Sequence, residues 1–154
     1  MLTPDQILLG FGWYIVFVFS TCLHEAAHAW SARLLGDSTA YHGGQVTLNP
    51  VPHVRREPIG MIVVPLVSFV YAGWMMGWAS APYDPFWAGR HPRRAALMSL
   101  AGPAANLLLA IVSGVLIRVG LEGGWFEPSS SVGFSHVVRA AAGGPFAALA
   151  VFLS

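Results

Sequence analysis

Long uncharged apolar runs, separated by shorter polar segments, dominate the pattern of this chain. No charged residue occurs in residues 7–23, 59–83 or 95–117, and a fourth apolar run covers residues 140–154. A helix needs about 20 residues to cross the hydrocarbon core of a bilayer, so the second and third runs are long enough. The first run is slightly short, but its helical pattern can continue into the polar residues after it. The pattern therefore predicts an all-α integral membrane protein with three to four membrane segments.

The residues around the first run predict where its helix ends and which element comes next. The helix is expected over residues 5–35, and Gly36 fits a C-terminal stop. In the "GGQVTLNP" of residues 43–50, Val46 and Leu48 alternate with a polar residue, as in a strand with one apolar face. We therefore expect a short β-strand or hairpin after the first helix.

Prolines and glycines mark the remaining connections, and on this ground residues 82–94 and 120–139 are predicted to be loops. The run at residues 59–83 either spans the membrane or forms a re-entrant hairpin broken near Pro65 or Gly73. A hairpin would put the arginines that come after the first and second runs on the cytoplasmic side together, as the positive-inside rule favours. The arginines predicted to anchor to anionic lipid are Arg55, Arg56, Arg90, Arg93 and Arg94.

The composition agrees with a membrane protein. Of the 154 residues, 55% are hydrophobic and 10% are charged, and the mean hydropathy is +0.60. The net charge is +1, which does not suggest nucleic-acid binding. Cys22 is the one cysteine of the sequence, so no internal disulfide can form, and we expect it to be a small apolar residue of the first helix.

The most specific chemical signal is "HEAAH" at residues 24–28, at the end of the first apolar run. On a helix, residues i and i+4 lie about 40° apart on one face, so His24 and His28 present two imidazoles that suit one metal ion. Zinc is expected, because imidazole and carboxylate ligands suit it and it brings no redox chemistry. Glu25 is rotated by about 100° from His24 and can act as the general base on a zinc-activated water. This pattern is typical of zinc peptidases, and ionisable residues inside membrane segments are usually functional.

Two other interpretations of the motif compete with the zinc site. The first is a polar helix end near the membrane interface, which would not require this spacing. The second is a bis-histidine haem, which needs histidines on facing helices at matching depth. His91 and His136 lie in predicted loops, and a haem would leave Glu25 without a role. The zinc peptidase interpretation accounts for all three residues of the motif.

With these residues, the chain resembles the site-2 proteases, which are intramembrane zinc metalloproteases, and in particular their small bacterial members. The resemblance rests on "HEAAH" and on three less specific segments: "GGQVTLNPVPH" at 43–53, "EPIG" at 57–60 and "AGPAAN" at 101–106. It implies a single membrane-embedded metalloprotease-like domain over residues 1–154, in a multi-pass protein of the bacterial inner membrane. It also implies a zinc cofactor, and substrates that are peptides or membrane proteins cut near the membrane boundary.

The chain departs from the family at the third zinc ligand. Family members take it from an aspartate in a later helix, in a pattern like Asn-x-x-Pro…Leu-Asp-Gly, and the sequence has no such element. Its aspartates are Asp5, Asp37 and Asp84, and none has that context. We expect either a C-terminally incomplete chain, with the ligand beyond Ser154, or a substitute ligand, for which His53 is the best candidate. A ligand from a second chain would also complete the site, and the oligomeric state is left open.

Two further features bear on substrate binding. A strand edge at residues 45–48 could hold an unwound substrate segment by strand addition. In "AGPAAN", small residues let helices approach closely in lipid, and Asn106 needs a hydrogen-bond partner, either a neighbouring group or a substrate backbone. If the site does not cut, the alternative function is a catalytically inactive membrane scaffold that binds helices or partner proteins.

Overall fold

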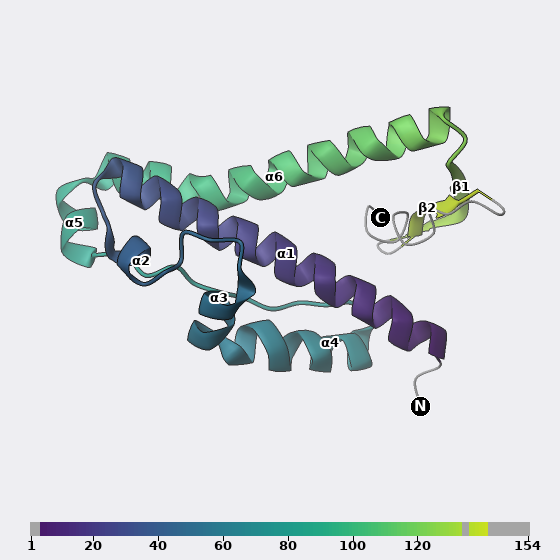
Figure 1. The fold of residues 1–154 in the computed structure, drawn as a ribbon, viewed down its shortest axis with the longest axis horizontal. Helices are drawn as coiled ribbons and strands as arrows, with labels where there is room; N and C mark the ends of the chain where they lie inside the picture. The colour runs from purple at the N-terminus through teal and green to yellow at the C-terminus, as the bar shows by residue number, and fades with distance from the viewer. Residues whose placement is uncertain (1–3, 134–135, 142–154) are drawn as a thin grey trace. The chain divides into compact units, whose positions relative to one another are not determined.

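A computed structural model of the protein describes residues 4–133 and 136–141, and these residues are mostly helical (Figure 1). The chain divides into two compact units: residues 17–107 form one, and residues 1–16 with 108–154 form the other. The candidate site lies within the first unit. In chain order the elements are α1 (Pro4–Leu35), α2 (Thr39–His42), α3 (Pro50–Arg56), η1 (Ile59–Val63), α4 (Val64–Ala72), α5 (Pro85–Arg90), α6 (Pro92–Glu122), β1 (Phe126–Gly133) and β2 (His136–Ala140).

Two helices among the described residues are long and apolar enough to cross a membrane: Gln6–Leu35 within α1, and Pro92–Glu122, which is α6. They correspond to the first and third apolar runs of the sequence. α1 ends where the sequence predicts, because Gly36 adopts a φ of 108°, a left-handed conformation that favours glycine. The fourth run, residues 140–154, falls almost entirely outside the described residues. The described part of the chain thus contains two of the three to four predicted segments.

The second apolar run folds into a hairpin instead of one long helix. The 5-residue π-helix η1 and the 9-residue α4 together rise about 21 Å, less than the roughly 30 Å of a hydrocarbon core. Pro65 lies in the first turn of α4, at the change from the π-helix to the α-helix. Proline is tolerated there because its missing N–H interrupts the helical hydrogen bonds at a point where their pattern already changes. Gly73 ends α4 with a φ of 77°, and residues 75–84 run back without regular secondary structure. Of the two alternatives left open by the sequence, the structure therefore has the chain broken at Gly73, and residues 59–83 do not form a single helix.

Residues 75–84, here called the return segment, pack directly on η1. The amide N–H of Trp78 donates to the carbonyl oxygen of Gly60 at 3.2 Å. Two glycines make this approach possible, because a Cβ on Gly60 would collide with the backbone of Trp78, and one on Gly77 would collide with the carbonyl of Gly60. The return segment is therefore held beside the helix that precedes it.

The polar residues after α1 form short helices and bends, so the β-strand predicted after the first helix is wrong. Residues 46–48 form a bend between α2 and α3. The side chain of Asn49 accepts a hydrogen bond from the amide of Val51 at 3.0 Å and caps α3, whose first residue is Pro50. The capped start of α3 determines the local structure more strongly than an alternation of apolar and polar residues over only three positions. In the described part of the chain, no strand pairs with the bend.

Two strands form where the sequence predicts a loop, in residues 120–139. β1 pairs antiparallel with β2, with Phe126 opposite Ala140. Phe126 and Val138 are buried, and Ile117 of α6 packs against them. The loop prediction is wrong because the serines and glycines of this segment obscure the few apolar residues that the hairpin buries.

Candidate metal centre

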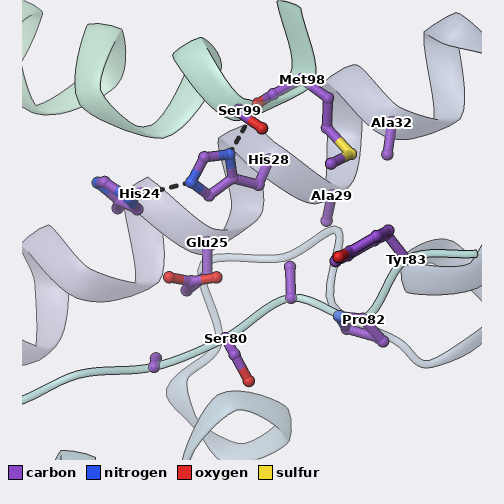
Figure 2. Close-up of a pocket in the computed structure, with 12 residues that line it drawn as sticks. His24, Glu25, His28, Ala29, Ala32, Ser80, Pro82, Tyr83, Met98 and Ser99 are labelled. Carbon is purple, nitrogen blue, oxygen red and sulfur yellow. Dashed lines mark hydrogen bonds between the residues drawn. The ribbon is translucent and has the colours of Figure 1, made fainter. Parts of the chain in front are cut away.

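His24 and His28 lie one turn apart on α1, and their imidazoles meet edge to face (Figure 2). Their Nε2 atoms are 3.1 Å apart. Zinc–nitrogen distances of about 2.0–2.1 Å in tetrahedral geometry would put two ligand nitrogens about 3.3 Å apart. The pair therefore fits two ligands of one zinc ion, and the helical spacing of the motif is what brings the two rings together.

The carbonyl group of Met98 determines which nitrogen of His28 is free. Nδ1 of His28 lies 2.8 Å from that carbonyl oxygen. A carbonyl oxygen only accepts hydrogen bonds, so Nδ1 carries the proton and Nε2 of the neutral ring keeps its lone pair. Metal-binding histidines are commonly oriented by such a hydrogen bond from the other ring nitrogen. The Nε2 that faces His24 is therefore in the form that binds a metal.

Gly102 of α6 lies directly against the Nε2 atoms of the two imidazoles. A Cβ on this glycine would be 2.5 Å from Nε2 of His24 and would also collide with Nε2 of His28. Only a residue without a side chain lets α6 come this close, and Gly102 is buried there. The "AGPAAN" segment thus packs α6 against the histidines, in the way that small residues pair membrane helices.

Asn106 lies one turn beyond Gly102 on α6 and contacts α1. Its Oδ1 accepts a hydrogen bond from the hydroxyl of Ser20 at 3.4 Å, and Ser20 is one turn before His24. Asn106 does not line the pocket described below. A neighbouring side chain is therefore the partner that the structure shows for Asn106, while its predicted contact with substrate stays a prediction.

Glu25 is buried, with 6% of its surface exposed, and its carboxylate lies on the side of the histidine pair that faces Ser80 (Figure 2). The backbone of Ala81 hydrogen-bonds to this carboxylate, and His53 and Arg56 act on it electrostatically. The carboxylate thus lies beside the histidine pair (Figure 2). It does not form a three-ligand group with the two histidines in the described part of the chain. This position suits a group that takes a proton from a water held at the metal.

The three residues of the motif open into a pocket of about 330 Å³. Its walls come from α1, from the return segment and from the first turns of α6 (Figure 2). Besides the motif, its lining residues are Ala29, Ala32, Ala79, Ser80, Ala81, Pro82, Tyr83, Met98 and Ser99. Most of the lining from the return segment is small, which leaves open space beside the carboxylate.

Hydrogen bonds hold the return segment across the pocket at its middle and at its last residue. In the middle, the hydroxyl of Ser80 donates to Oε1 of Glu57 at 2.6 Å and accepts from Nε of Arg56 at 3.2 Å. At the last residue, the amide N–H of Asp84 donates to Oδ2 of Asp37 at 2.9 Å. Sequence reasoning missed these contacts, because each joins distant residues that meet only after the second apolar run has turned back.

Asp37 is a buried carboxylate that binds the backbone of a loop. Its Oδ1 accepts from the amide and the hydroxyl of Thr39, at 2.9 and 2.6 Å, in addition to the bond from Asp84. Burial raises the pKa of Asp37, but these hydrogen bonds outweigh burial and lower the pKa below its ordinary value. The side chain of Asp84 in turn accepts from the amide of Phe86 and caps α5. Both aspartates therefore serve to fix the chain between α1 and α5.

The structure does not bring His53 into a three-ligand group with His24 and His28. In the part of the chain that the structure describes, no three histidine, cysteine, aspartate or glutamate side chains are grouped so as to hold a metal ion. His53 is buried, and its Nε2 donates to the carbonyl oxygen of Thr47 at 2.9 Å. Its Nδ1 is buried without a hydrogen-bond partner in the same part of the chain. The structure therefore brings the two predicted ligands His24 and His28 together and identifies no third ligand among the residues it describes.

The chain is similar to bacterial proteins that are named zinc metalloproteases. It is 35% identical over 104 residues to "Putative zinc metalloprotease YwhC" of Bacillus subtilis, which covers 67% of this chain and 43% of that protein. It is 30% identical over 131 residues to "Putative zinc metalloprotease Rip2" of Mycolicibacterium smegmatis, which covers 85% and 46% respectively. The "Putative zinc metalloprotease Rip2" of Mycobacterium tuberculosis is 36% identical over 103 residues. The match covers 66% of this chain and 36% of that protein. No protein-family model and no solved structure matches the chain.

The chain spans less than half the length of these curated relatives. Their names support a zinc metalloprotease in general terms. The spacing of the two imidazole nitrogens is compatible with a zinc ion between them. The names of the relatives are what indicate zinc in particular.

Proposed function

We propose that the protein is an intramembrane zinc endopeptidase of the site-2 protease type, located in the bacterial inner membrane, that hydrolyses peptide bonds of membrane proteins. The observation that carries the proposal is the pair of imidazole nitrogens, 3.1 Å apart, beside the buried carboxylate of Glu25. All three side chains stand on a helix that is long and apolar enough to cross a membrane. The similarity to proteins named zinc metalloproteases supports the proposal.

In this proposal His24 and His28 hold the zinc ion through their Nε2 atoms. When bound, the ion polarises the substrate carbonyl and lowers the pKa of a water molecule toward about 7. Glu25 takes a proton from the attacking water and delivers it to the leaving amine as the C–N bond breaks, so that water is added across the peptide bond. The carbonyl of Met98 keeps the ring of His28 oriented with Nε2 free.

A third protein ligand completes the site, since catalytic zinc is commonly held by three side chains. Within the described residues the proposed ligand is His53, whose buried Nδ1 lacks a partner and whose ring acts electrostatically on Glu25. Its use would require a movement of the short helix α3, because the structure forms no three-ligand group among the residues it describes. A residue outside the described ranges, or in a second chain, is the other source. The zinc content of a His53→Ala variant separates these sources.

We place the substrate along the return segment, in extended form. Residues 79–81 are small, line the pocket beside Glu25 and have no regular secondary structure. A substrate helix hides its peptide bonds in its own hydrogen bonds, so it has to unwind locally before it can be cut. Strand addition to the return segment would hold the unwound residues. The return segment takes the place of the strand edge at residues 45–48 that the sequence predicted as the site of strand addition, because the structure has no strand there.

The test compares wild type with Glu25→Gln in bacterial membranes that contain a single-span protein with a reporter on each side. Cleavage is expected to fall by about 10²- to 10⁴-fold, because the general base is lost. Zinc content is expected to stay at the wild-type value, because Glu25 is not a ligand. Glu122→Gln serves as the matched control, since Glu122 is exposed on α6 and pairs with Arg118 one turn away. Equal cleavage by wild type and Glu25→Gln would refute the proposal and leave the inactive scaffold as the better account.

A further inference from the structure

Tyr83 belongs to the pocket, and its phenol points into it from the return segment (Figure 2). Tyr83 is 50% exposed. One part of its side chain therefore packs on the protein, and the other part can contact a bound molecule. Its hydroxyl has no hydrogen-bond partner within the described ranges. The function proposed above gives this residue no role.

The other two hydroxyls of the pocket and the ring N–H of His28 have their hydrogens engaged. The hydroxyl of Ser80 donates to Glu57, and the hydroxyl of Ser99 donates to the backbone carbonyl of Ala95 at 3.0 Å. The proton of the His28 ring is held by the carbonyl of Met98. Among the lining residues, Tyr83 is therefore the one hydroxyl whose hydrogen remains free, within the described part of the chain, for a bound substrate.

Hydrolysis of a peptide bond is accelerated by such a donor. As water attacks, the carbonyl oxygen of the substrate gains negative charge, and a hydrogen-bond donor already in place lowers the energy of that state. Donors contribute most where they need not reorganise during the reaction. A phenol on a fixed stretch of backbone meets this requirement better than a flexible side chain would.

The backbone on both sides of Tyr83 is fixed. Pro82 precedes it and restricts its own φ to about −65°. Asp84 comes directly after it, with its amide N–H bound to Oδ2 of Asp37 and its side chain capping α5 through the amide of Phe86. Asp37 is therefore a positioning residue, which acts on the pocket only through the backbone next to Tyr83.

From these contacts we infer that Tyr83 is a further catalytic residue, whose hydroxyl donates a hydrogen bond to the substrate carbonyl oxygen as this oxygen gains charge. Tyr83 keeps its proton throughout, and the water proton still passes through Glu25 to the leaving amine. This inference rests on the proposed peptidase function. It predicts that loss of the hydroxyl slows the chemical step while zinc and substrate still bind.

The experiment measures hydrolysis of fluorescein-labelled casein, an unfolded protein substrate, by the zinc-loaded protein in detergent micelles. Tyr83→Phe is expected to lower kcat roughly 100-fold, the usual effect of removing one such donor. KM and zinc content are expected to stay near the wild-type values, because the ring is kept and the hydroxyl is not a ligand. A peptidyl phosphonate carries a negative oxygen in place of the carbonyl, so its inhibition constant is expected to rise by a similar factor.

Tyr71→Phe is the matched control, because Tyr71 is 87% exposed on α4 and does not line the pocket. Wild-type kcat and phosphonate inhibition in Tyr83→Phe, with an inactive Glu25→Gln, would overturn the role of Tyr83 and leave the peptidase function standing. A raised KM with unchanged kcat, or loss of zinc, would also overturn it, because either result indicates a binding or structural role. If Glu25→Gln cleaves casein as wild type does, the peptidase function and the role of Tyr83 fail together.

Discussion

Gly102 of α6 lies so close to the imidazole of His24 on α1 that a Cβ on the glycine would be 2.5 Å from Nε2 of the histidine. The contact places the backbone of one apolar helix against the metal-facing atoms of another. It packs α6 against the Nε2 side of both imidazoles, while the hydrogen bond from Nδ1 of His28 to Met98 orients one of them. The geometry of the metal pair therefore depends on a residue that carries no functional group.

Replacing Gly102 with alanine is expected to weaken zinc binding by about 10- to 100-fold, the range typical of changes in the groups that orient metal ligands. The added methyl must displace one ring or push α6 away. The measurement is the zinc retained per chain after dialysis against chelators of graded strength. Gly114→Ala on the same helix is the control, because a Cβ there meets nothing within 4 Å. Equal zinc retention by both variants would contradict this account of the contact.

Zinc per chain also tests the ligand assignments. His24→Ala and His28→Ala are each expected to abolish retained zinc. Each variant removes one of the few protein ligands that hold the ion. His42→Ala, at an exposed position in α2, is expected to retain wild-type zinc. His53→Ala decides the third ligand: loss of zinc places His53 at the metal, and full retention assigns the ligand to another residue. Retained zinc in His28→Ala would refute the metal pair itself.

The motif could be found from the sequence because its geometry is local. A spacing of four residues fixes the relative position of His24 and His28 on any helix, and the left-handed preference of glycine ends that helix at Gly36. The same holds for the break at Gly73, which has a φ of 77°. Each of these features depends on residues within one or two turns of each other.

Contacts between distant residues could not be predicted in this way. Ser80 and Tyr83 reach the pocket because the second apolar run turns back, and nothing in "ASAPYD" indicates which helix it will face. The strand predicted within residues 43–50 fails for a related reason, because a strand needs a pairing partner that local alternation does not reveal. The small residues of "AGPAAN" indicate close helix packing, but only the structure reveals that the histidines lie at this contact.

Asp37 makes the stability of the protein depend on pH. Its pKa is lower in the folded protein than in the unfolded chain, so its contribution to stability is complete above the unfolded pKa of about 3.9 and is lost as the pH falls through the folded value. Asp37→Asn is expected to cost about 1–3 kcal/mol at neutral pH, because buried hydrogen bonds from Thr39 and Asp84 are lost or weakened. The difference from wild type should shrink below about pH 4, as wild type loses the charge.

Thermal unfolding in detergent at pH 7 and at pH 3 measures this difference. Glu122→Gln is the control, because its exposed ion pair with Arg118 contributes only about 0.3–0.5 kcal/mol. A destabilisation of Asp37→Asn that is the same at both pH values would show that the carboxylate charge is not what holds the loop.

Variants of Asn106 and Ser20 distinguish two possible roles of Asn106, which are pairing of α6 with α1 and binding of substrate. If their 3.4 Å hydrogen bond is the role of Asn106, then Ser20→Ala and Asn106→Ala each lose about 0.6 kcal/mol of stability, and the double variant loses little more. Peptidase activity should then be the same in the two single variants. We expect this outcome, because Asn106 does not line the pocket. A tenfold or larger loss of activity confined to Asn106→Ala would instead mean that the amide leaves Ser20 and binds the substrate backbone during cleavage.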